Sequence, residues 1–234
     1  MELKRVVVTG LGAITPIGND VQSFWQGLVD GKSGAADITK FDATDFKTKF
    51  ACEVKGFDVS QFLHRKESRK MDLFAQYAIA CTDEALADAG LAGEEPNVDH
   101  DRVGVIWGSG IGGFQTFMNE ALNFHESGGV PRFSPFFIPM MISDIAAGHI
   151  SIRNGFRGPN FCTVSACASG TNAMIDAFNY IRLGKAEVMV TGGSEAAITE
   201  GGIGGFNALK ALSTRNDDPA RASRPFDATR DGFV

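Results

Sequence analysis

The chain has 234 residues, of which 44% are hydrophobic and 21% are charged, a balance typical of a globular protein that can bury one or two cores. Its net charge of -6 disfavours general binding to the acidic backbone of nucleic acids. The sequence has no run of about 18 apolar residues and no signal-peptide pattern at its start, so we expect neither membrane insertion nor secretion. Four cysteines without a regular spacing favour a reducing, cytoplasmic environment over a disulfide framework.

Three short apolar runs that end in glycine predict β-strands. They cover residues 5–10, 102–108 and 187–193, and each is rich in valine or isoleucine. Near-continuous apolar runs of this kind are typical of strands that are buried on both faces of a parallel sheet.

Apolar residues with helical spacing predict two helices between and after these strands. One covers residues 71–89 and the other includes residues 174–181, with Gly90 and Gly184 available to end them in a left-handed conformation. Strands that alternate with helices indicate an α/β fold. We expect surface connections over residues 94–101 and over most of Ser213 to Arg230.

Residues 108–113 match the G-x-G-x-x-G pattern of a dinucleotide-binding loop, between a predicted strand and a helix. The pattern is weak alone, and no acidic residue closes a second strand about 20 positions later, as that fingerprint requires. A tight strand-to-helix turn is therefore the favoured interpretation, and a nicotinamide-dependent oxidoreductase is the less favoured alternative.

The histidines give no metal site and no clear general base. None of the pairs formed by His64, His100, His125 and His149 has the spacing of metal ligands. We expect each of them to be structural or exposed to solvent.

Cys167 is the strongest candidate for a reactive group. It lies among the small residues 165–170, between a predicted strand and the second predicted helix. A helix N-terminus, equivalent to roughly +0.5 charge, favours the thiolate, and the strand–turn–helix arrangement is that of a nucleophile elbow. From spacing alone, a nucleophile and a buried structural thiol are equal alternatives. Cys52, Cys81 and Cys162 are expected to be small buried apolar residues.

Short motifs run through the whole chain in a fixed order, and each is modest alone. They cover residues 5–12, 15–18, 69–75, 108–113, 134–137, 147–149, 157–159, 165–170, 190–195, 211–216 and 223–227. Together they resemble the N-terminal half of a β-ketoacyl-[acyl-carrier-protein] synthase, most closely the type II elongating enzyme of fatty-acid synthesis.

This resemblance implies an α/β fold of the thiolase-like layered αβαβα kind, of which residues 1–234 supply about the N-terminal half. It also implies a cytoplasmic homodimer without a cofactor. In the family, two histidines, a lysine and a second oxyanion amide decarboxylate malonyl and polarise its thioester, and they lie in the C-terminal half. None of the four histidines here matches them, so we expect residues 1–234 alone to be inactive.

The resemblance assigns the chemistry to Cys167. The matching cysteine of the family takes the acyl chain from acyl carrier protein as a thioester. Malonyl carrier protein is then decarboxylated, and its carbanion attacks the thioester to give a β-ketoacyl product. A non-catalytic chain-length partner of the same family is the alternative, but such partners typically carry another residue at this position.

The resemblance also implies binding residues. Ile111, Phe137 and Phe206 match positions that shape the acyl pocket, with Phe137 reaching across the dimer interface. An apolar tunnel of this kind explains in part why the chain has 19 phenylalanines but 2 tyrosines and 2 tryptophans. In the family, basic residues at the positions of Lys66, Lys70 and Lys210 bind the acidic carrier protein. Without the resemblance, the charged run of residues 64–70 would be interpreted as a surface exposed to solvent.

Overall fold

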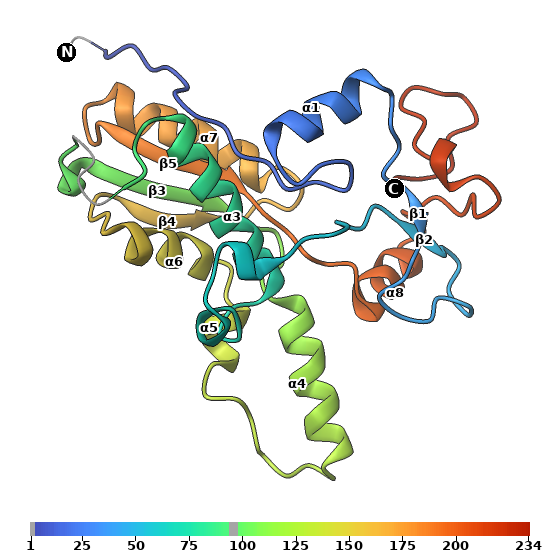
Figure 1. Ribbon diagram of the computed structural model, residues 1–234. Helices are drawn as coiled ribbons and strands as arrows, with labels where there is room; N and C mark the ends of the chain where they lie inside the picture. The colour runs from blue at the N-terminus through green and yellow to red at the C-terminus, as the bar shows by residue number, and fades with distance from the viewer. Residues whose placement is uncertain (1–2, 94–97) are drawn as a thin grey trace. The chain divides into compact units, whose positions relative to one another are not determined.

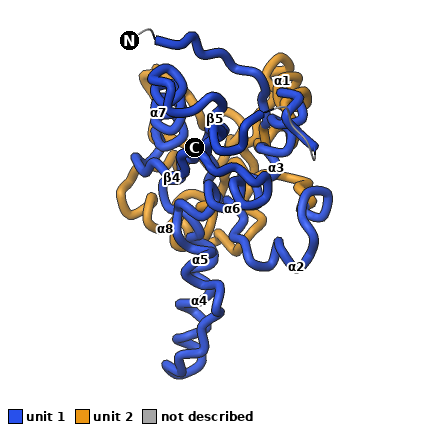
Figure 2. Tube along the Cα trace, turned by 90° about the vertical axis from the view of Figure 1, so that its left-hand side faces the viewer, with its two compact units in different colours: residues 1–12, 59–196 blue, residues 13–58, 197–234 orange. Residues whose placement is uncertain are grey.

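The computed structural model of the chain describes residues 3–93 and 98–234. The chain divides into two compact units (Figure 2). Unit 1 consists of residues 1–12 and 59–196, and unit 2 of residues 13–58 and 197–234. The connection predicted over residues 94–101 lies in part outside the described residues.

A parallel sheet forms the centre of unit 1. In the described part of this unit it has three strands, with β3 (Val103–Gly108) between β4 (Asn160–Thr163) and β5 (Val188–Gly193). The register pairs Gly108 with Thr163 on one side and with Gly193 on the other, so the carboxyl ends of the strands lie level. The strands predicted over residues 102–108 and 187–193 are confirmed.

Helices cover both faces of this sheet (Figure 1). Helix α7 (Ser169–Arg182) packs on all three strands, and its Ala173 and Ala177 lie against the fully buried Ile106. Helix α6 (Ile145–Asn154) contacts β3 and β4 and packs against α3 (Leu73–Asp88). The resulting helix–sheet–helix order agrees with the predicted α/β class. The remaining helical segments of this unit are η1 (Val59–Gln61), α2 (Arg65–Ser68), η2 (His100–Arg102), α4 (Phe114–Glu126) and α5 (Phe137–Met141).

The two helices predicted from apolar spacing are present, and local chemistry explains their ends. Asp72 caps the start of α3, where its side chain accepts a hydrogen bond from the N–H of Phe74. After α3, Gly90 has a φ of +68°, and after α7, Gly184 has a φ of +71°. Both values lie in the left-handed region, which glycine enters without a steric penalty.

The strand predicted over residues 5–10 is not formed in the described structure. Among the described residues this segment has no regular secondary structure and belongs to no sheet, and Val7 and Val8 are exposed by 58% and 79%. The apolar pattern shows that the segment suits a buried strand. A strand also needs a partner for its backbone groups, and apolar periodicity carries no information about the partner.

Helix α4 extends away from the sheet of unit 1 (Figure 1). Phenylalanines of this helix and of the segment leading to α5 stack on one another, with ring centroids 5.4 Å apart for Phe124 and Phe133 and 5.6 Å apart for Phe133 and Phe137. Phe117, Phe124 and Phe133 are nevertheless each at least 40% exposed. The segment from α4 to α5 therefore presents an apolar surface.

Unit 2 has a smaller core of its own. Its elements are α1 (Val21–Val29), β1 (Ala36–Asp37), β2 (Phe50–Ala51), α8 (Glu200–Ala208) and η3 (Pro219–Arg221), with β1 and β2 antiparallel. Ile38, Ala51, Ile203 and Leu212 are buried together, and Phe206 packs against them.

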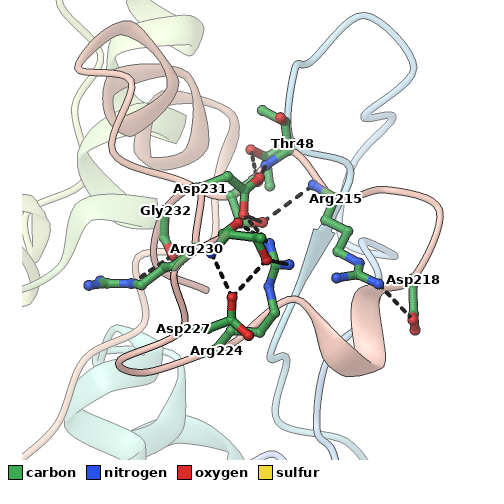
Figure 3. A network of polar contacts seen from close by, with 11 residues as sticks. Thr48, Arg215, Asp218, Arg224, Asp227, Arg230, Asp231 and Gly232 are labelled. Atoms are coloured by element: carbon green, nitrogen blue, oxygen red, sulfur yellow. Dashed lines mark hydrogen bonds and ion pairs between the residues drawn. The ribbon is translucent and has the colours of Figure 1, made fainter.

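Polar contacts hold the irregular segment after Ser213, which confirms the predicted connection apart from the short η3 (Figure 3). Arg224 donates hydrogen bonds to the backbone oxygen of Thr229 and to the carboxylate of Asp231. Asp231 also accepts from the hydroxyl of Ser213 and the N–H of Thr214, and these hydrogen bonds lower the pKa of its carboxyl group.

Over residues 3–93 and 98–234, no helix combines the length and the apolar character needed to cross a membrane.

Candidate active site

Cys167 lies in a sharp turn between β4 and α7, and its side chain is exposed. The preceding residue, Ala166, has a φ of +51°, a left-handed conformation that is uncommon for a residue other than glycine. The hydroxyl of Ser169 stabilises this turn, since it donates to the carbonyl oxygen of Ala166 at 2.6 Å and accepts from the N–H of Ser165 at 2.9 Å. The structure thus shows the strand–turn–helix arrangement, with the Cys167 thiol exposed in this chain.

Three glycines allow α7 to begin directly at the carboxyl edge of the sheet. A Cβ on Gly108, the last residue of β3, would overlap the backbone of Ser169 and Gly170. A Cβ on Gly193, the last residue of β5, would lie 2.8 Å from the Cα of Gly170. Because side chains are absent at these positions, the backbone of the helix start approaches both strand ends, and Cys167 lies at this edge.

The loop after β3 lies beside the Cys167 turn. A Cβ on Gly110 would lie 3.5 Å from the Cα of Ala166, which is ordinary van der Waals contact. The carboxylate of Glu195, which follows β5, accepts hydrogen bonds from the N–H groups of Gly110 at 2.7 Å and of Ile111 at 3.1 Å. Segments after β3, β4 and β5 therefore meet at Cys167.

The same contacts explain the glycines of residues 108–113. Gly112 and Gly113 approach the backbone of α5 and of the residues after it, and the N–H of Gly113 donates to the oxygen of Met141 at 2.9 Å. The N–H groups that a dinucleotide fingerprint would direct at a pyrophosphate are here bonded to the carboxylate of Glu195. This geometry supports the interpretation as a tight turn.

The remaining cysteines have different environments from that of Cys167. Cys52, Cys81 and Cys162 were expected to be buried, and the structure shows them half-buried. Burial raises the pKa of the Cys52 and Cys162 thiols and so disfavours their thiolates.

Two of the three predicted acyl-pocket residues belong to the loop after β3 or to a segment that contacts it. Ile111 is 40% exposed and directly follows Gly110, which contacts the turn. Phe137 begins α5, and the backbone bond from Gly113 to Met141 joins that helix to the loop of Ile111. Phe206 belongs to unit 2, where its ring lies 5.5 Å from that of Phe233.

The predicted carrier-binding lysines are all exposed. Lys66 lies in the short helix α2, and Lys70 follows this helix with its Nζ 5.0 Å from the ring centroid of Phe136. This cation–π contact joins the basic segment to the aromatic segment that includes Phe137. Lys210, at the end of α8 in unit 2, has a left-handed φ of +56°.

The contacts of His64, His100 and His149 involve residues other than Cys167. His64 caps α2, the Nδ1 atom of His100 lies 3.1 Å from the oxygen of Gly155, and desolvation lowers the pKa of His149 in α6. Among the described residues, no group of three His, Cys, Asp or Glu side chains could hold a metal ion.

The sequence interpretation did not assign Glu195 or Ser109. Ser109 is 1% exposed, and its hydroxyl donates to Glu195 at 3.3 Å and accepts from the N–H of Gly112 at 3.1 Å. A signal was available, because Ser109 directly follows β3 and Glu195 lies two residues after β5, and both strands were predicted to be parallel. Polar residues at the carboxyl ends of neighbouring parallel strands are expected to meet.

The chain is similar to known proteins of one family. The profile of the family described as Beta-ketoacyl synthase, N-terminal domain, matches residues 3–234. The chain is 51% identical over 234 residues to 3-oxoacyl-[acyl-carrier-protein] synthase 2 of Synechocystis sp., a match that covers 100% of this chain and 56% of that protein. The chain thus spans about half the length of this curated relative.

Two solved structures have the same fold. A β-ketoacyl synthase from Burkholderia phymatum matches with a TM-score of 0.87 and 33% identity, over 99% of this chain and 56% of its own. A type II PKS ketosynthase, solved in complex with its acyl-carrier protein, matches with a TM-score of 0.76 and 26% identity, over 90% of this chain and 57% of its own. The predicted thiolase-like α/β fold is therefore confirmed.

Proposed function

The chain belongs to the β-ketoacyl synthase family, and from this membership we propose that it forms the acyl-accepting part of a 3-oxoacyl-[acyl-carrier-protein] synthase of fatty-acid elongation. One observation carries the proposal: the exposed Cys167 thiol follows a left-handed residue in the turn before α7. We assign residues 1–234 to the N-terminal half of the layered fold.

In the first step, the sulfur of Cys167 attacks the carbonyl carbon of an acyl thioester on the carrier protein. A carbon–sulfur bond forms to Cys167, and the bond to the thiol of the carrier protein breaks. The turn supports this step because the thiol is exposed and is flanked by small residues, which leave room for a thioester to approach. The backbone N–H of Cys167, close to the start of α7, is our candidate donor to the oxyanion that forms.

In the second step, malonyl carrier protein loses CO₂, and the resulting carbanion attacks the acyl thioester on Cys167. A carbon–carbon bond forms, the bond to sulfur breaks, and the β-ketoacyl product leaves on the carrier protein. We assign the decarboxylation to no residue of this chain.

We propose that Ile111 and Phe137 of unit 1 bind the acyl chain, and we propose the same role for Phe206 of unit 2. The support in unit 1 is the exposed side chain of Ile111 beside the Cys167 turn and the stacked phenylalanines that include Phe137. Each buried CH₂ of a linear chain is worth about 0.8 kcal/mol, so an apolar lining suits such a substrate.

For the carrier protein, we propose docking on Lys66, Lys70 and Lys210, which are all exposed. The ketosynthase solved with an acyl-carrier protein is a relative in fold that binds such a partner.

We further propose a cytoplasmic homodimer. The exposed apolar side chains between α4 and α5 support the dimer, because a soluble monomer rarely presents a large apolar patch.

The proposed function is tested by incubating the full-length protein with an acyl carrier protein that carries a radiolabelled acyl chain. We expect one acyl group per chain, mapped to Cys167 by peptide mass, and none in Cys167→Ala. The matched control Cys162→Ala keeps the label, because Cys162 lies in β4 and is half-buried. Acylation that persists in Cys167→Ala would contradict the proposal.

A further inference from the structure

We propose that Glu195 is a positioning residue, whose carboxylate holds the loop of residues 109–112 against the Cys167 turn and thereby sets which acyl chains reach the thiol. This inference rests on the proposed function, since it concerns acyl transfer to Cys167. Its basis is the set of contacts that Glu195 makes between two strand ends.

The carboxylate binds the loop through both oxygens. Its Oε2 accepts from the N–H of Gly110 at 2.7 Å and of Ile111 at 3.1 Å, while its Oε1 accepts from the hydroxyl of Ser109 at 3.3 Å. The same hydroxyl accepts from the N–H of Gly112 at 3.1 Å. Directly or through Ser109, one side chain thus fixes three consecutive N–H groups, and hydrogen bonds to a charged acceptor are stronger than neutral ones.

The loop that Glu195 holds has two neighbours that matter for acyl transfer. On one side, Gly110 packs against Ala166, the left-handed residue before Cys167. On the other side, Gly112 and Gly113 pack against the end of α5, the helix that Phe137 begins. A shift of this loop therefore changes the position of Ile111 relative to both the thiol and the aromatic segment.

The base of Glu195 is itself fixed. The preceding residue, Ser194, accepts a hydrogen bond from the indole Nε1 of Trp107 at 2.9 Å, and its own N–H donates to the oxygen of Gly108 at 3.1 Å. Trp107 is 4% exposed and lies in the central strand β3. Glu195 is therefore attached to a residue that is hydrogen-bonded to the central strand, and Glu195 itself is exposed.

The test compares Glu195→Ala with Glu195→Gln in the full-length protein. Single-turnover acylation is measured by intact mass with acyl-pantetheine thioesters of increasing chain length. For Glu195→Ala we expect acylation by long chains to fall about tenfold or more relative to that by acetyl, because small displacements at a reacting centre have effects of this size. Glu195→Gln should stay within about twofold of the wild type, because one amide oxygen can accept from both N–H groups.

Matched controls separate this role from a general structural one. Glu187, just before β5, pairs with Arg102 at 3.7 Å, and Glu187→Ala should leave the chain-length profile unchanged. Gly110→Ala should reproduce the defect if Glu195→Ala does not fold, because its Cβ would lie 2.9 Å from Oε2 of Glu195. The rate of iodoacetamide labelling at Cys167 should be unchanged in all variants.

Three results would overturn the inference. The first is an unchanged chain-length profile in Glu195→Ala or Gly110→Ala. The second is a defect in Glu195→Gln as large as that in Glu195→Ala. The third is an equal fall in the rate of acylation by all chain lengths and in the rate of iodoacetamide labelling. A wild-type protein that is not acylated at Cys167 would instead contradict the proposed function.

Discussion

Asp72 and Thr116 lie 44 residues apart in the sequence, yet one carboxylate oxygen of Asp72 accepts hydrogen bonds from both the N–H and the hydroxyl of Thr116, at 2.9 and 2.6 Å. The other oxygen of Asp72 accepts from the N–H of Phe74 at the start of α3. Asp72 is 4% exposed, so it joins the first turns of α3 and α4 inside unit 1.

We predict that Asp72→Ala lowers the free energy of unfolding by about 2–3 kcal/mol, because it leaves buried donors without an acceptor. Thr116→Val removes the hydroxyl but keeps the N–H, and should cost about 1 kcal/mol. Urea denaturation measures both. Asp20→Ala, which removes the exposed cap of α1, is the matched control and should cost about 1 kcal/mol. A loss in Asp72→Ala no larger than that in Asp20→Ala would refute this account.

We predict that Cys167 is the first thiol to react with a limiting amount of iodoacetamide. Cys167 is exposed, whereas Cys52, Cys81 and Cys162 are half-buried and burial raises the pKa of Cys52 and Cys162. Peptide mapping of the folded protein measures the order of labelling. Earlier labelling of Cys162 or Cys81 would argue against Cys167 as the nucleophile.

We predict that replacing Lys66, Lys70 and Lys210 together by glutamate slows association with acyl carrier protein. An acidic partner is attracted by exposed positive charge, so the on-rate should fall about tenfold or more at low salt and depend less on salt concentration. Stopped-flow fluorescence measures both rates. Lys40→Glu, Lys47→Glu and Lys55→Glu together form a charge-matched control from unit 2. Equal on-rates for the wild type and the first triple variant at low salt would exclude this docking surface.

We predict that Glu195→Gln gains stability relative to the wild type as the pH rises. Desolvation raises the pKa of the Glu195 carboxyl group above its usual value of 4.5, although hydrogen bonds from Gly110 and Ile111 oppose the shift. A raised folded-state pKa means that the stabilising contribution is complete below about 4.5 and is lost as the pH rises through the folded-state value. Glutamine has no such dependence.

Urea denaturation of the two proteins between pH 4 and pH 8 measures this difference. The unfolding free energy of Glu195→Gln minus that of the wild type should increase over the lower part of this range and then remain constant. A decrease in this difference with rising pH would show that the folded-state pKa is lowered instead.

The local features of the fold were predictable because their causes are local. Glycine after α3, glycine after α7 and the apolar runs of β3 and β5 are read from neighbouring residues. The segment 5–10 has the same apolar pattern but forms no strand in the described structure, because strand formation depends on a partner elsewhere in the chain.

The site was predictable only in part, because some of its features also depend on residues elsewhere in the chain. Small residues around Cys167 are visible in the sequence, whereas the left-handed conformation of Ala166 and its contact with Gly110 depend on tertiary packing. Glu195 illustrates this limit, because its hydrogen-bond donors lie about 85 positions earlier in the chain. The position of Glu195 after a predicted strand places it at this edge of the sheet, but it does not identify the N–H groups that the carboxylate binds.

This separation in sequence has a kinetic consequence. The Cys167 turn is supported by segments that follow three strands, and pairing β3 with β5 closes a long loop of chain, a slow step in folding. Until that pairing is complete, nothing holds Gly110 and Gly193 beside the start of α7. We therefore expect the Cys167 turn to form late in folding, and the time course of Cys167 labelling during refolding should follow the assembly of the sheet.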